Sequence, residues 1–119
     1  MEMKSAIASL GALAHEGRLS TFRLLVQAGP DGLAAGEVAR RLGVLPNTLS
    51  ASLNVLSHAG LISARREGRS VIYTANYDGM RDLLAFLMED CCGGSPEICA
   101  PLAELVQRAA CCVPQSAPV

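Results

Sequence analysis

The sequence has 119 residues, of which 50% are hydrophobic, with two Phe, two Tyr and no Trp. This length suits a single domain whose core is built mainly from Leu, Ala, Val and Ile. No apolar run approaches the length of a membrane span, and Ala6 to Ala14 lacks the charged and apolar regions of a signal peptide. We therefore expect a cytoplasmic chain with no membrane partner.

The formal net charge of −1 argues against a chain that is basic throughout, but the charges are unevenly distributed. Between Arg40 and Ser70, five arginines face Glu67 alone, which gives a local balance of +4. From Asp78 to the end of the sequence, two arginines face six carboxylates, a balance of −4. Attraction to phosphate depends on the local field. The middle of the chain is therefore suited to meeting nucleic acid, whereas its last part is not.

Apolar spacing predicts two helices before the first turn. Lys4 to Leu13 carries one apolar stripe, and we expect this helix to help form an interface, with simple covering of the core as the alternative. Arg18 to Gln27 forms a second helix with a buried face. His15 stands at the cap position before it and is given a structural role. Residues 29–32 form a turn rich in Gly and Pro.

A short helix, a tight turn and a longer helix follow. Leu33 to Leu42 is predicted to be helical and is stopped by Gly43. The next helix runs from about Pro46 to His58, with Pro suited to its first position. Leu45 replaces the usual Ser or Thr cap. This is a helix-turn-helix arrangement, in which the arginines that end the first helix would lie near backbone phosphates. They are Arg40 and Arg41.

The outer face of the second of these helices is polar but carries no charge. Short hydrogen-bonding or small side chains of this kind fit the DNA major groove, and an ordinary surface helix is the alternative. The predicted groove-facing residues are Asn47, Thr48, Ser50, Ala51, Ser52 and Asn54.

Two β-prone runs, Leu61 to Ala64 and Val71 to Ala75, predict a hairpin around a turn that contains glycine. The turn carries Arg65, Arg66 and Arg69, more arginines than solubility requires. A basic hairpin directly after a helix-turn-helix is the winged-helix plan, with the wing contacting DNA. A merely solvated turn is the alternative.

The segment Tyr77 to Asp90 returns to helical periodicity, with Asp78 favouring its start. It is too apolar for a lone surface helix, so it predicts a homodimer formed with the first helix. Two-fold symmetry would then place the recognition helices roughly 34 Å apart on DNA, or a multiple of it. The predicted fold is mainly α with a small β-hairpin. One domain spans residues 1–112, including a cysteine segment, and residues 113–119 form a disordered tail.

Five cysteines lie in the last quarter of the sequence, and their odd number argues for thiolate chemistry over a disulfide framework. Cys91, Cys92 and Cys99 supply three thiolates, which are too few for structural zinc but suit trivalent arsenic or antimony. Cys111 and Cys112 follow a further predicted helix. Three interpretations stay open for them: accessory ligands, a source of a fourth sulfur for zinc or cadmium, or bystanders. A redox switch through neighbouring thiols is the main alternative.

Three stretches resemble the ArsR/SmtB metalloregulatory repressors. They read LAHEGRLSTFRLL, GEVARRLGVLPNTLSASLNVLSHAGLI and REGRSVIY. The resemblance implies a winged-helix homodimer that leaves its operator when metal binds, with the DNA-contacting residues already named. Many arsenic sensors of this family have cysteines on the first helix of the helix-turn-helix, whereas residues 36–39 here contain none. The ligands that zinc sensors place on the last helix are also missing after Asp78.

We therefore expect a repressor that binds operator double-stranded DNA and dissociates when As(III) or Sb(III) binds the first three cysteines. Its expected biological role is the control of arsenical resistance. A redox-sensing or Cd/Zn-responsive repressor of the same fold is the alternative, and a winged-helix module for protein interaction is another. An enzyme is not expected. A thiol arsenate reductase typically has Arg six positions after its Cys, and the five corresponding positions hold Glu, Ile, Leu, Ala and Pro.

Overall fold

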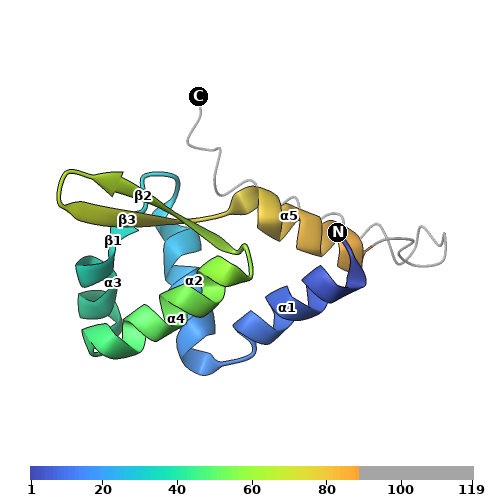
Figure 1. The fold of residues 1–119 in the computed structure, drawn as a ribbon, viewed down its shortest axis with the longest axis horizontal. Coiled ribbons are helices and arrows are strands. Elements are labelled where there is room, and N and C mark those ends of the chain that lie inside the picture. The colour runs from blue at the N-terminus through green and yellow to red at the C-terminus, as the bar shows by residue number, and fades with distance from the viewer. Residues whose placement is uncertain (89–119) are drawn as a thin grey trace. The chain divides into compact units, whose positions relative to one another are not determined.

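The structure, a computed structural model, describes residues 1–88. Figure 1 shows the elements in chain order. They are α1 (Met3–Leu13), α2 (Glu16–Ala28), β1 (Leu33–Ala34), α3 (Ala35–Leu42), α4 (Pro46–His58), β2 (Ile62–Glu67), β3 (Ser70–Ala75) and α5 (Tyr77–Leu87). The predicted end of the last helix, the five cysteines and the predicted tail lie outside the described residues. Met1–Phe86 forms one compact unit.

The helix boundaries follow from local chemistry. His15 accepts a hydrogen bond at Nδ1 from the Gly17 amide over 3.1 Å, which confirms its predicted capping role at α2. Gly43 takes the left-handed conformation (φ 67°) that ends α3. Helix α4 spans the predicted residues, with Leu45 extended before Pro46 and making no side-chain cap.

A small antiparallel sheet completes the domain, with the strand order β1-β3-β2. The predicted hairpin is confirmed, with Ile62 paired to Ala75 at its base. The prediction that a helix begins at Leu33 was wrong, because Leu33 and Ala34 pair with β3 and form a third strand. Gly32, at φ +73°, lies so close to β3 that a Cβ there would be 2.4 Å from the Tyr73 carbonyl oxygen. This close approach allows β1 to pair with β3.

The core lies between α2, α3, α4 and the base of the sheet. Leu25, Val38, Leu56 and Leu61 are fully buried there, with Phe22 as the one buried aromatic residue among those described. These are the aliphatic residues that the composition predicts. Their burial fixes the rotation of α4 about its own axis, so the opposite side of that helix points outward.

The start of α5 is bonded to the ends of two other helices. Asn76 accepts a hydrogen bond from the Gly79 amide (3.1 Å) and is therefore the side-chain cap. Asp78 lies in the first turn, where its charge favours the start of the helix as predicted. The Asn76 side-chain amide also donates to the Gly60 carbonyl oxygen (2.9 Å). The Tyr77 hydroxyl donates to the Val26 carbonyl oxygen at the end of α2 over 3.2 Å. In the described part of the chain, no helix is long and apolar enough to cross a membrane.

Candidate nucleic-acid interface

Helices α3 and α4 pack against each other and are joined by a three-residue turn, Gly43 to Leu45. Strands β2 and β3 follow α4 directly, with β2 in contact with α4 and β3 in contact with α3. Figure 1 shows the hairpin at the end of the domain where α3 lies. The helix-turn-helix and the hairpin that the sequence predicts therefore belong to one contiguous unit.

The outward side of α4 is the predicted neutral polar face, with one correction. Its exposed members are Asn47, Thr48, Ser50, Ala51 and Asn54. Ser52 was predicted to belong to this face, but only 8% of it is exposed. Its hydroxyl lies near Gly17 of α2, where an added Cβ would be 3.9 Å from Oγ. Ser52 therefore lies on the packed side of the helix and is removed from the candidate interface.

His58 and Val55 are also exposed on α4, although neither was predicted to belong to its outer face. His58 lies four positions after Asn54 and contacts the carbonyl oxygen of Asn54 through Nδ1 at 2.8 Å. Val55 was assigned to the apolar stripe, yet it is 40% exposed. Helical spacing from Asn47 and Ala51 through Asn54 to His58 is the signal that could have found the histidine.

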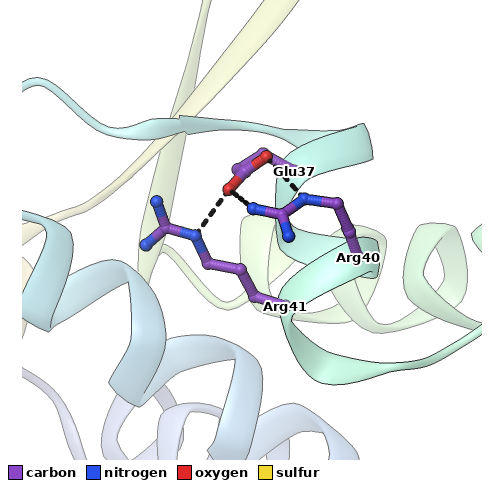
Figure 2. Close-up of polar contacts among 3 residues, drawn as sticks. All are labelled: Glu37, Arg40 and Arg41. Atoms are coloured by element: carbon purple, nitrogen blue, oxygen red, sulfur yellow. Dashed lines mark hydrogen bonds and ion pairs between the residues drawn. The ribbon is translucent and has the colours of Figure 1, made fainter.

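The arginines of α3 share one carboxylate, as Figure 2 shows. Glu37 accepts from Arg40 through both Nε (3.1 Å, to Oε1) and Nη2, and from Arg41 through Nε (2.7 Å, to Oε2). These hydrogen bonds, from Arg40 first, lower the pKa of Glu37 to about 2. The local balance of +4 omitted Glu37; over residues 37–70 five arginines and two glutamates give +3. Its spacing of three and four residues from the arginines would have predicted the pairs.

The three predicted wing arginines occupy different environments. Arg65 and Arg66 lie on β2, and only Arg69 lies in the turn where all three were predicted. Arg65 pairs with Glu67 (Nε to Oε2, 2.6 Å) and also donates to the carbonyl oxygens of Asp31 (2.7 Å) and Pro30 (3.4 Å). It therefore fixes the wing to the turn after α2.

Arg66 and Arg69 are exposed, and neither forms an ion pair within residues 1–88. Consecutive strand residues point to opposite faces, so Arg66 projects away from the side on which Arg65 is held. These two cations are the wing residues free to meet phosphate. No cluster of three or more metal-ligating side chains occurs among residues 1–88.

Taken together, a helix-turn-helix with a neutral polar face on its second helix and a basic hairpin after it define a winged helix-turn-helix DNA-binding domain. Residues 13–64 match a family described as a helix-turn-helix domain. The chain is 32% identical over 89 residues to the transcriptional activator HlyU of Vibrio cholerae, covering 73% of this chain and 80% of that protein. It spans 62% of the length of an HTH-type transcriptional regulator of Mycobacterium tuberculosis, Rv0081, at 34% identity.

Solved structures agree with this assignment. An ArsR-like transcriptional regulator from Rhodococcus sp. RHA1 superposes with a TM-score of 0.68 at 25% identity, covering 89% of this chain and 93% of that one. The homodimeric winged helix-turn-helix domain of Mb0332 from Mycobacterium bovis, described as a possible ArsR-family regulator, gives 0.61 at 31% identity, covering 72% and 78%. The chain belongs to the ArsR family of helix-turn-helix transcriptional regulators.

Proposed function

We propose that this regulator is a homodimeric repressor that leaves its operator when As(III) or Sb(III) binds Cys91, Cys92 and Cys99. The observation that carries the inducer assignment is the grouping of these three thiols directly after the helical segment of α5. Three thiolates match the three bonds and lone pair of a trivalent metalloid. The first helix of the helix-turn-helix, α3, carries no cysteine.

The DNA-binding part of the proposal rests on the exposed side of α4 and on the wing. Asn47 and Asn54 are exposed amides that can pair with base edges in the major groove. Arg66 and Arg69 can neutralise phosphates beside that groove. Position on the duplex would then come from the arginines and sequence preference from α4.

The homodimer is supported by apolar side chains on two helices. Helix α1 buries the small residues Ala6, Ser9 and Ala12, whereas its larger residues Ile7 and Leu10 are 61% and 43% exposed. On α5, Leu84 and Leu87 are 42% and 51% exposed. Large apolar residues left exposed on two helices are typical of an interface that a second copy covers.

The proposed response to the inducer is a shift between two states of the dimer. In the proposed mechanism, forming three metalloid–sulfur bonds needs the end of the predicted Tyr77 to Asp90 helix to unwind, which favours a dimer whose half-site spacing no longer fits the operator. Moving the bound fraction from nearly full to nearly empty requires a difference of about 5 kcal/mol in inducer affinity between the two states.

The test is fluorescence anisotropy on a labelled duplex taken from the region upstream of the gene for this chain. As(III), Sb(III), Zn(II), Cd(II) and peroxide are titrated separately under conditions that keep the thiols reduced before each addition. We expect release by As(III) and Sb(III) alone. Release by Zn(II) or Cd(II) would point to a fourth ligand, and release by peroxide alone, reversed by dithiothreitol, would establish the redox alternative.

A matched pair of cysteine variants locates the sensor. Cys99→Ser should bind the duplex as the parent does but no longer respond to As(III), because one of three ligands is lost. Cys112→Ser should still respond to As(III), since that thiol is not one of the three proposed ligands. A Cys99→Ser protein that still leaves the duplex on addition of As(III) would disprove the three-thiol site.

A further inference from the structure

We propose that Glu37 sets the number of phosphates that α3 can neutralise, because it occupies Arg40 and leaves the terminal nitrogens of Arg41 free to contact the DNA backbone. The inference rests on the proposed DNA-binding function. It distinguishes two adjacent arginines that both bond to Glu37: Arg40 has one edge of its guanidinium occupied by the carboxylate, whereas both terminal nitrogens of Arg41 make no hydrogen bond among the described residues.

The two arginines engage Glu37 in different ways. Arg40 uses Nε and Nη2, one on each carboxylate oxygen, so its planar fork is occupied along one edge. Arg41 uses Nε alone, at 2.7 Å from Oε2. Figure 2 shows both terminal nitrogens of Arg41 extending away from the carboxylate. No hydrogen bond among the described residues engages those two nitrogens.

A contact with a phosphate would give Arg40 little additional stabilisation beyond its present contact with Glu37. Both are anions with paired oxygens that fit the same edge of a guanidinium. Transferring Arg40 from the carboxylate to a phosphate would therefore exchange one bidentate contact for another and would leave Glu37 facing the DNA with less compensation. Arg41 can add a phosphate contact through its terminal nitrogens while its Nε remains bonded to Glu37.

Glu37 offsets part of the positive charge of Arg40 and Arg41 throughout the physiological pH range. The hydrogen bonds from the two arginines hold the pKa of Glu37 at about 2, so this carboxylate stays ionised at neutral pH. One negative charge against two positive charges leaves α3 with a single net cation at this end. Phosphate binding by α3 should therefore behave as one contact for each protomer, not two.

The test measures salt dependence on a labelled 30-base-pair duplex of random sequence, since phosphate contacts do not depend on sequence. The slope of log K against log[salt] steepens by about 0.9 for each phosphate contact. For each protomer on DNA, Arg41→Ala should reduce the slope by about 0.9. Glu37→Gln should steepen it by about 0.9 and tighten binding at low salt, because Arg40 is released.

Two double variants and one control separate this assignment from a general charge effect. Glu37→Gln with Arg40→Ala, and Glu37→Gln with Arg41→Ala, should each return to the parent slope, because each leaves one free arginine. Glu67→Gln removes the same charge from the wing but should leave the slope unchanged, since Arg65 stays bonded to the carbonyl oxygens of Pro30 and Asp31. Urea unfolding of each variant confirms that it is folded.

The outcomes are distinct. A Glu37→Gln protein with an unchanged or shallower slope would overturn the role of Glu37, and an unchanged slope for Arg41→Ala would overturn that of Arg41. Equal steepening by Glu67→Gln would also overturn the proposal, since it would show an effect of net charge alone. A parent protein that shows no salt-dependent binding to any duplex would refute the DNA-binding function itself, and this inference with it.

Discussion

The arginines of α3 and those of the wing are both found beside carboxylates, but the two regions use the ion pair differently. Arg40 and Arg41 bond to Glu37 within the same two turns of helix, so the pairing adjusts the charge of α3. Arg65 bonds to Glu67 and also reaches carbonyl oxygens more than 30 positions earlier in the chain. The ion pairs within α3 thus set how much charge that helix presents. The long-range hydrogen bonds of Arg65 instead set where the wing lies.

The largest expected effect comes from breaking the support of the wing. Gly32→Ala would place a Cβ 2.4 Å from the Tyr73 carbonyl oxygen and 2.5 Å from Thr74 Cγ2, at a φ of +73°. The turn must then move away from β3, and with it the carbonyl oxygens that hold Arg65. We expect the free energy of unfolding to fall by about 3 kcal/mol, measured by urea denaturation.

The matched control is Gly43→Ala. That glycine also has a positive φ (+67°), but nothing lies within 4 Å of an added Cβ. Only the conformational cost remains, so we expect a loss of about 1 kcal/mol. Equal losses at the two sites would show that the contact with β3 is not what makes Gly32 necessary.

A smaller effect should distinguish two neighbouring residues of the wing. Arg65→Ala removes two hydrogen bonds to main-chain carbonyl oxygens, and we expect a loss of about 1 kcal/mol in the free energy of unfolding. Arg66→Ala removes no interaction found within the described residues and should change stability by less than about 0.5 kcal/mol. For DNA binding we expect Arg66→Ala to have the larger effect of the two variants. It should reduce the slope of log K against log[salt] by about 0.9 per protomer. Similar stability losses for both variants would contradict this division.

The smallest effect concerns the local pairs of α3 and depends on pH. Because the folded pKa of Glu37 is lowered to about 2 from an ordinary value of 4.5, its pairs stabilise the fold above pH 4.5. That contribution is lost as the pH falls from 4.5 toward 2. The stability difference between the parent and Glu37→Gln should therefore shrink over this interval, measured by urea denaturation at successive pH values. A difference that is the same at pH 3 and pH 6 would argue against the pairs.

Sequence patterns predicted the elements whose signals are local. Helix α4 was predicted from Pro46 to His58 because a proline at the first position and regularly spaced leucines mark both its start and its buried side. The hairpin was predicted from two β-prone runs around Gly68. Strand β1 was missed because two residues show no periodicity, and its pairing of Leu33 with Tyr73 spans 40 positions.

The interface was predicted less completely than the fold, because several of its features depend on contacts between residues far apart in the sequence. Ser52 is a small polar residue at the border of the α4 face, and only its packing beside Gly17 shows that it is buried. The hydrogen bonds of Arg65 to the α2–β1 turn depend on tertiary structure, so no spacing rule finds them. The pairs of Glu37, in contrast, follow from helical spacing. The three-cysteine sensor stays a prediction.

The joint at the start of α5 has a mechanical consequence. Asn76 and Tyr77 bond this end of the helix to Gly60 and Val26, and a Cβ at Gly79 would be 2.7 Å from the Gly60 carbonyl oxygen. Helix α5 has 11 residues with a rise of 1.5 Å each, so it extends about 16 Å from an end that is bonded to the turn after α4. A 1 Å displacement of its far end corresponds to a tilt of about 4°. We expect such a tilt to act on the turn that follows α4, because the Asn76 side chain is bonded to the Gly60 carbonyl oxygen there.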